Sequence, residues 1–270
     1  MLLSLSGFLF EDDYRTQSVD LARFCRVAAS AGYGGVELRR TQISPTASVR
    51  QRREMLHVVK DEGLLVTCIT ARDLPTGGTE RNDTFMAYLE LCRDMECPLL
   101  KVSGSPAWLR EGASKAQDFG VALASNNHLN SPLETVEGTR RHMAEVAHAN
   151  FGLLYDSMHL YLSGEDYLGC IGEFLRMTMN ILVHSMRQAR PNEAMAIESR
   201  GLSWTPALPD AAGVQDWPGI FRAFRQGGYD GLVTVIESGW APEHRQRVAR
   251  RCAEAVRQFW RTGRPEERVC

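Results

Sequence analysis

The chain of 270 residues lacks three features that would assign it a function directly: a charge excess, a paired-cysteine motif and a long apolar run. Its net charge is −2, so there is no electrostatic attraction to nucleic acid and no nucleic-acid partner is expected. The opening MLLSLSGFLFEDDY has no basic segment and only a short apolar stretch. It predicts neither a signal peptide nor a membrane span, and no membrane partner is expected.

The seven cysteines are scattered, and no two form a CxxC pair. Their odd number and irregular spacing argue against a disulfide framework and against a zinc–thiolate site. Several lie in apolar patterns, where a thiol behaves as a small hydrophobic group. A reducing cytoplasm is therefore the expected location. With 44% hydrophobic and 24% charged residues, the chain has enough apolar material for a large core.

Short strand-like runs alternate with amphipathic helical patterns along the whole chain. Apolar residues recur at three- and four-residue steps in the helical segments, as in Leu21, Phe24 and Val27. The expected strands are Leu2–Phe8, Gly35–Leu38, Leu64–Ile69, Leu99–Val102, Val121–Ser125, Gly152–Asp156, Asn180–His184 and Leu232–Glu237.

Eight strand–helix repeats without a break in composition predict an α/β fold, a single-domain (β/α)8 TIM barrel over residues 1–262 with a C-terminal tail at 263–270. A doubly wound open sheet is the alternative, but no glycine-rich phosphate motif follows the first strand. The segment Pro191–Asp216 is rich in Pro, Gly and Ala, so we expect a long loop that covers one end of the barrel.

Polar residues follow the later strands at the end where barrel enzymes place their chemistry. Asn126, Asp156, His184 and Glu237 come from the last four strands and would meet at one rim. Two carboxylates, an imidazole and an amide oxygen form a set suited to one divalent metal, Mn²⁺ above all, with Mg²⁺, Co²⁺ or Zn²⁺ as alternatives. Taken singly, each residue would more often end a strand and point to water. Together they predict a metal site.

Several of these segments together resemble the xylose isomerase-like TIM barrel superfamily, which includes sugar phosphate isomerases and epimerases and AP endonuclease family 2. The resembling stretches are AASAGYGGVELR, NNH, DSMH, VH and DWPGIFRAFRQGGYDGLVTVIES. The resemblance implies a divalent metal held by Glu, Asp, His and Glu, of which Asp156, His184 and Glu237 are present. It also implies a small-molecule substrate and association into a homodimer.

The chain departs from the family pattern at Asn126, where the resemblance implies a glutamate. An amide keeps an oxygen ligand but removes a full negative charge, so metal affinity should fall. The superfamily's epimerases pair two glutamates as acid and base, and here only Glu237 remains of that pair. Pro132, six residues after Asn126, is no substitute. Two-base epimerisation is therefore disfavoured.

The remaining residues suit one-base chemistry next to a carbonyl group. We expect a metal-dependent isomerase- or epimerase-family enzyme that acts on a small sugar or polyhydroxy carbonyl compound, by isomerisation or dehydration. Glu237, His128 and His159 are the candidate catalytic groups. The two histidines are the candidate proton carriers, because imidazole titrates near neutrality. A dehydratase branch of the superfamily resembles this chain in its x-x-H and D-x-x-H motifs. The candidate substrate-binding residues are Glu37, Arg39, Lys101, Arg190 and Trp240. Arg190 lies six residues after His184, and the resemblance implies substrate binding at this spacing, which some sugar epimerases use.

Two other functions remain open from the sequence. A DNA-repair endonuclease of this fold would need a ring of histidine and acid ligands for several metals, and most of the seven histidines lie in helical patterns away from the rim. A metal-free, non-catalytic or ligand-binding member is the second alternative, and Asn126 is the observation that motivates it. Retention of Asp156, His184 and Glu237 argues against such a loss of function.

Overall fold

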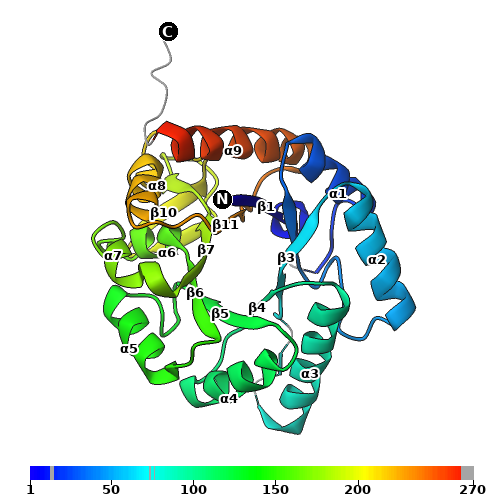
Figure 1. Ribbon diagram of the computed structural model, residues 1–270. Coiled ribbons are helices and arrows are strands. Elements are labelled where there is room, and N and C mark those ends of the chain that lie inside the picture. Colours follow the sequence, from blue (N-terminus) through cyan, green and yellow to red (C-terminus); the bar gives the residue numbers. More distant parts are fainter. Residues whose placement is uncertain (13–14, 73, 76, 263–270) are drawn as a thin grey trace.

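The computed structural model, which describes residues 1–12, 15–72, 74–75 and 77–262, is a closed parallel barrel ringed by helices (Figure 1). The predicted tail 263–270 lies outside the described residues. Around the barrel the strand order is β1, β11, β7, β6, β5, β4, β3, β2. The barrel strands are β1 (Leu2–Ser6), β2 (Gly35–Leu38), β3 (Leu65–Thr70), β4 (Leu99–Lys101), β5 (Ala122–Asn126), β6 (Phe151–Tyr155), β7 (Thr178–Val183) and β11 (Leu232–Val235). The (β/α)8 prediction is confirmed.

Helices connect successive strands and cover the outside of the barrel (Figure 1). They are α1 (Leu21–Ser30), α2 (Val49–Asp61), α3 (Gly78–Asp94), α4 (Pro106–Gln117), α5 (Val136–Val146), α6 (Ser157–Leu162), α7 (Ile171–Phe174), α8 (Trp217–Gln226) and α9 (Pro242–Thr262). Two 3₁₀ turns accompany them, η1 (Gly7–Phe10) and η2 (Leu175–Met177).

The helix boundaries follow from local chemistry. Ser48 and Gln51 form a capping box that satisfies N–H groups at the start of α2. Asp20 accepts the Arg23 N–H at 2.7 Å at the start of α1. After α1 the chain turns at Gly32, whose φ of +79° lies in the left-handed region that favours glycine.

The buried apolar residues fall into separate layers because strand side chains alternate between two faces. The largest group packs the outward faces of the strands against the helices. A smaller group fills the barrel interior and consists of Cys68, Leu99, Ala124, Leu154, Leu182 and Ile236. The same alternation brings Asn126, which follows Ala124 by two residues, to the inner side of β5.

The prediction of a long loop at Pro191–Asp216 is wrong in part. A small antiparallel sheet occupies this region, with β10 (Leu202–Pro206) between β8 (Met186–Gln188) and β9 (Ile197–Ser199). Met186 and Trp204 pack with Leu129, Met158 and Leu162 in an apolar cluster of their own. The sheet therefore covers part of the cavity described below, as was expected of the loop.

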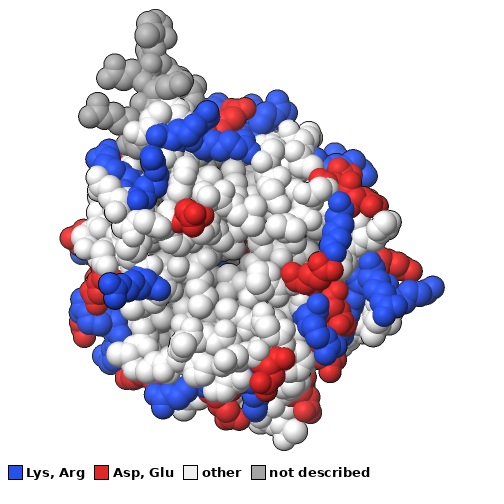
Figure 2. Space-filling view, in the orientation of Figure 1, with Lys and Arg blue, Asp and Glu red and all other residues white. Residues whose placement is uncertain are grey.

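No described helix is long and apolar enough to cross a membrane. On the face of the molecule shown in Figure 2, acidic and basic side chains are interspersed around the periphery, while uncharged residues occupy the middle. This distribution agrees with the net charge of −2.

Candidate functional site

A cavity of about 770 Å³ opens where the strands end, and it is lined mainly by residues at or just after the carboxyl ends of the strands. Lys101 ends β4, Asn126 ends β5, and Asp156 and His184 directly follow β6 and β7. This is the end of a parallel barrel at which connecting loops converge. Sequence and structure therefore agree on where the polar residues gather.

Asp156, His159 and His184 form the central group of this cavity. One ligand atom from each of the three lies within 4.8 Å of the other two, and all three residues are buried. Asp156 precedes α6 directly, and His159 lies one turn into that helix, so both side chains face the same space. The distance from His159 Nε2 to Asp156 Oδ2 is 3.7 Å.

One oxygen of the Asp156 carboxyl group lacks the hydrogen bond that a buried charge normally receives. Its Oδ1 atom is buried and has no hydrogen-bond partner. Burial raises its pKa to about 7, against the lowering effect of the Lys101 ammonium and of nearby N–H groups. Because an unpartnered buried carboxylate is costly, this oxygen is set up to receive a cation or a ligand.

The two imidazoles of His128 and His159 stack with their ring centroids 4.2 Å apart, and their backbone contacts select opposite tautomers. His128 Nδ1 lies 2.7 Å from the Leu129 carbonyl oxygen, which can only accept, so this nitrogen carries the proton and Nε2 holds the lone pair. His159 Nδ1 accepts the Leu129 N–H at 3.3 Å, so its proton lies on Nε2. One ring is thus set to accept a proton and the other to donate a hydrogen bond.

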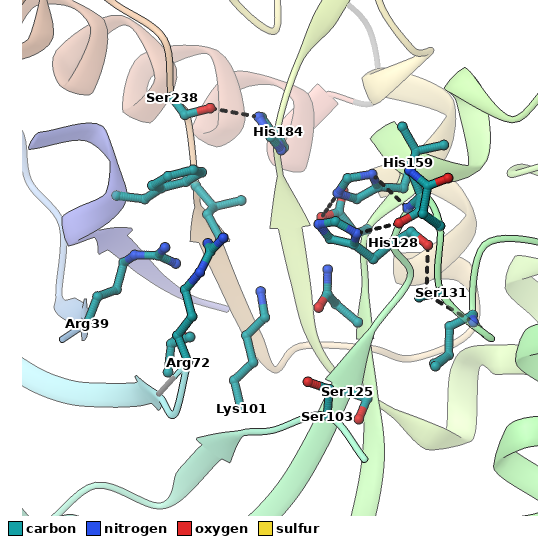
Figure 3. Close-up of a pocket in the computed structure, with 18 of the residues that line it drawn as sticks. Arg39, Arg72, Lys101, Ser103, Ser125, His128, Ser131, His159, His184 and Ser238 are labelled. Carbon is teal, nitrogen blue, oxygen red and sulfur yellow. Dashed lines mark hydrogen bonds and ion pairs between the residues drawn. The ribbon is translucent and has the colours of Figure 1, made fainter. Parts of the chain in front are cut away.

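His184 is held neutral by its surroundings. Burial above all, with the positive charges of Lys101 and Arg39, lowers its pKa to about 3. Its Nε2 lies 3.3 Å from Ser238 Oγ (Figure 3). A neutral imidazole is the form that binds a metal ion.

Asn126 lines the cavity beside this group but already uses its amide. Its Nδ2 donates to the Asn127 carbonyl oxygen at 2.6 Å, and its side chain also lowers the pKa of Asp156 by hydrogen bonding. The neighbouring Asn127 is fully buried and holds Thr139 Oγ1 at 2.8 Å. Asn126 therefore faces the reacting side of the cavity, whereas Asn127 faces the helix layer.

Glu237 is close in sequence to the cavity but does not line it. Ile236 and Ser238 line the cavity, and Glu237 between them is fully buried. Its Oε1 accepts the Ser185 N–H at 3.0 Å, and Trp240 Nε1 lies 3.4 Å from Oε2. Burial raises its pKa to about 8. Its roles as ligand and base remain predictions.

The cationic residues lie on the opposite side of the cavity from the stacked histidines (Figure 3). Arg39 lines the cavity and is tied down by Glu11 at 3.1 Å and Glu37 at 3.8 Å. Glu37 itself does not line the cavity; its Oε1 accepts the Thr70 hydroxyl at 2.8 Å. Lys101 is half-buried, and its ammonium has no ion-pair partner within 4.0 Å among the described residues.

The remaining two predicted substrate-binding residues lie apart from the cavity lining. Trp240 donates towards Glu237 and is half-buried. Arg190 is exposed beyond β8, where its N–H donates to Glu193 Oε2 at 3.0 Å. The spacing from His184 that suggested Arg190 is interrupted by β8, which carries the chain away from the cavity.

Sequence reasoning missed several lining residues, chiefly Phe8, Arg72, Ser125, Ser238, Met186 and Ile197. Arg72 follows the end of β3 by two residues, so reading that strand end would have found it. Ser238 follows Glu237 directly, and the alternation of side chains was the available signal. Met186 and Ile197 belong to the small sheet, whose strands are too short to be read from the sequence.

The residues present fit the divalent cation that the family implies. Asp156 offers a buried oxygen without a partner, and His184 offers a neutral imidazole. His159 would join them as a ligand only with its proton moved to Nδ1, away from the tautomer that Leu129 favours. Mixed oxygen and nitrogen ligands of this kind suit Mn²⁺, Co²⁺ or Zn²⁺.

The family described as xylose isomerase-like TIM barrel matches residues 25–259, and the chain belongs to this family. Among curated proteins, inosose dehydratase from Geobacillus thermodenitrificans (strain NG80-2) is 25% identical over 126 residues, which are 44% of this chain and 41% of that protein. The rhizopine catabolism protein MocC from Rhizobium meliloti is 31% identical over 135 residues, 47% of this chain and 40% of that protein. These matches thus span about two fifths of each relative.

Solved structures share the fold over nearly the whole chain. A xylose isomerase-like TIM barrel protein from Mycobacterium smegmatis, in complex with magnesium, has a TM-score of 0.75 at 14% identity and covers 97% of each chain. The probable 3-DHS dehydratase AsbF from Bacillus anthracis has a TM-score of 0.72 at 16% identity, with 95% of this chain and 99% of that chain covered. The family prediction is confirmed, and the relatives agree with an enzyme of the isomerase, epimerase or dehydratase type.

Proposed function

We propose that this protein is a metal-dependent dehydratase that eliminates water from a small polyhydroxylated ketone. The observation that carries the proposal is the convergence of Asp156, His159 and His184 in a cavity of about 770 Å³, with a buried oxygen of Asp156 left without a partner. The adjacent rings of His128 and His159 add a proton acceptor and a hydrogen-bond donor at the same place.

Dehydration accounts for the side chains better than epimerisation does. Epimerisation by two bases needs a carboxylate on each side of the substrate, but position 126 is an amide and Glu237 is directed to Ser185 and Trp240. Elimination needs one base that removes a proton and then returns it to the leaving hydroxyl, and His128 Nε2 can serve as that base. Several of the curated relatives are named inosose dehydratase, which supports a polyhydroxylated ring ketone as substrate class.

The reaction follows from which nitrogen of each histidine carries the proton. His128 Nε2 removes the proton from the carbon next to the ketone, because its other nitrogen is committed to the Leu129 carbonyl group. The electron pair of that C–H bond forms the new C=C bond, and the bond to the neighbouring hydroxyl breaks. The His128 imidazolium then gives this proton to the hydroxyl, which accepts a hydrogen bond from His159 Nε2 and leaves as water. His128 is neutral again at the end, and His159 keeps its proton throughout.

Asp156 and His184 would hold the cation, with the side-chain oxygen of Asn126 completing the set. When bound, a divalent cation polarises the ketone oxygen and stabilises the negative charge that develops there. The apolar cluster around Met186 and Trp204 limits access of bulk water to this side of the cavity. A cytoplasmic setting belongs to the proposal and is supported by the six described cysteines, all of which are free and buried.

The test is to incubate the protein with scyllo-inosose and Mn²⁺, and to follow loss of one water by mass spectrometry. We expect turnover by the wild type and a loss of about 100-fold or more in His128→Gln. His57→Gln is the matched control, because His57 is exposed on α2. Binding of the ketone without loss of water would contradict the proposal and favour the non-catalytic alternative. Exchange of the α-proton with deuterium without elimination would favour an isomerase.

A further inference from the structure

Lys101 is a cavity cation that has no ion-pair partner within 4.0 Å in the described part of the chain. It ends β4, and its side chain lies on the side of the cavity that faces the histidines (Figure 3). The other buried cation on this side, Arg39, already has Glu11 and Glu37 as partners and stacks over the ring of Phe8 at 4.2 Å. The two cations therefore have different roles.

The nearby carboxylates do not neutralise Lys101. Glu37 is engaged by Thr70 and Arg39, and Asp156 lies across the cavity beside His159. Burial lowers the pKa of Lys101, and the charge of Arg39 lowers it as well, against the raising effect of Glu37 and Asp156. An ammonium that is partly desolvated and unpaired is costly, and a ligand of negative charge would remove that cost.

Polar groups beside Lys101 can share such a ligand. Arg72, Ser103 and Gly104 line the cavity next to it, from the loops after β3 and β4. Figure 3 shows Arg72 and Lys101 side by side in the view, with Ser103 and Ser125 below them. One unpaired cation matches a group of one negative charge, and a carboxylate fits that requirement better than a doubly charged phosphate.

We propose that the substrate of this enzyme carries a carboxylate, and that Lys101, with Arg72 next to it, binds this group on the β3–β4 side of the cavity. The inference rests on the proposed function and names its substrate class: a polyhydroxylated keto acid. The carboxylate is held on one side, and the ketone then lies towards Asp156 and the stacked histidines. The enzyme should therefore bind neutral ketones less tightly than keto acids, because a neutral ketone leaves the Lys101 ammonium without an ion-pair partner.

The test uses two compounds that differ only in this group. 5-Keto-D-gluconate and L-sorbose have the same carbon skeleton and ketone, with a carboxylate in the first and a hydroxymethyl group in the second. We expect the wild type to bind the keto acid at least about tenfold more tightly by titration calorimetry. The preference should weaken as salt is added, because it is electrostatic.

Three lysine variants make the test specific, since the chain has only Lys60, Lys101 and Lys115. Lys101→Met keeps the aliphatic stem and should abolish the preference, whereas Lys101→Arg should keep part of it. Lys115→Met is the control, because Lys115 pairs with Glu111 on the outside of α4. Circular dichroism checks that each variant is folded. Equal affinity for both compounds, no binding of the keto acid, or an unchanged preference in Lys101→Met would overturn the proposal.

The same samples separate this inference from the proposed function. Loss of water from scyllo-inosose, a neutral ketone, reports on the dehydratase chemistry without the carboxylate. Turnover of scyllo-inosose with no preference for 5-keto-D-gluconate would overturn the carboxylate subsite alone. A preference that depends on Lys101, with no water eliminated from any ketone, would support the subsite and overturn the dehydratase proposal.

Discussion

The two sides of the cavity differ in how their charges are satisfied. On the β2–β4 side, Arg39 is bound by Glu11 and Glu37, and these contacts hold it in one place. On the β5–β7 side, the Asp156 carboxyl has an oxygen without a partner, and His159 and His184 are kept neutral by burial. The protein itself thus balances the charge of Arg39, whereas the buried Asp156 carboxyl faces neutral imidazoles. We place the chemistry on the β5–β7 side for this reason, and Lys101 is a cation on the β2–β4 side that has no ion-pair partner within 4.0 Å in the described part of the chain.

The largest effect is expected from Asp156→Asn. This variant keeps the shape of the side chain but removes the only carboxylate of the central group. Activity towards scyllo-inosose should fall by about 1000-fold or more, because cation binding and orientation are both lost. A steady-state assay at saturating Mn²⁺ measures it. Activity within about tenfold of the wild type would place the reaction elsewhere in the cavity.

The same variant should stabilise the metal-free protein in a pH-dependent way. The pKa of Asp156 rises from 3.8 in the unfolded chain to about 7 in the fold, so the folded state retains a proton that the unfolded chain has lost. Its contribution to stability is present below pH 4 and is lost as the pH rises towards 7. Relative to wild type, Asp156→Asn should gain about 2 to 4 kcal/mol between pH 4.5 and pH 8. Urea unfolding in EDTA at both pH values measures the free energy of unfolding of the variant and of the wild type. An equal difference between the two proteins at pH 4.5 and at pH 8 would contradict the prediction.

A smaller effect is expected from Asn126→Glu, which restores the family pattern on the reacting side. The added carboxylate supplies a charged ligand, so the affinity for Mn²⁺ should rise about tenfold or more. Competition with a chelating dye measures the dissociation constant. Asn127→Glu cannot serve as a control because Asn127 is fully buried, so Gln117→Glu at the exposed end of α4, outside the cavity lining, is used instead. Unchanged affinity in Asn126→Glu would mean that position 126 does not face the cation.

The smallest effect is expected from Arg190→Ala. Arg190 was suggested by its spacing from His184, but it is exposed and lies outside the cavity lining. The kcat/KM of the variant should stay within about twofold of the wild type, as for most surface substitutions. A loss of tenfold or more would show that the β8–β10 sheet brings Arg190 to the substrate, and the comparison between the two sides would have to include it.

The sequence predicted the barrel well because each buried parallel strand is a short apolar run that can be recognised by itself. The eighth barrel strand was expected at Leu232–Glu237 and lies at Leu232–Val235. The direction of residues just past a strand was harder to predict. Glu237 was expected at the rim, but Ile236 and Ser238 line the cavity instead. One residue of register decides which face a side chain takes, and residue type alone does not reveal it.

The small sheet and the ion pairs of the cavity also could not be predicted from the sequence. β8 and β9 have three residues each, and their partner β10 is recognised only once the chain has folded back. Likewise, Arg39 follows β2 and Lys101 ends β4, and both are cations. Only the structure shows that Arg39 has ion-pair partners, whereas Lys101 has none within 4.0 Å in the described part of the chain. Short strands and ion pairs depend on contacts between distant segments, which local patterns do not encode.

The central claim is that Asp156 and His184 hold a divalent cation. The most direct measurement is the metal content of the purified protein after loading with Mn²⁺ and removal of the excess, with wild type and Asp156→Asn side by side. The account predicts about one equivalent of metal in the wild type and its loss in the variant. No metal in the wild type, or equal metal in both proteins, would contradict it.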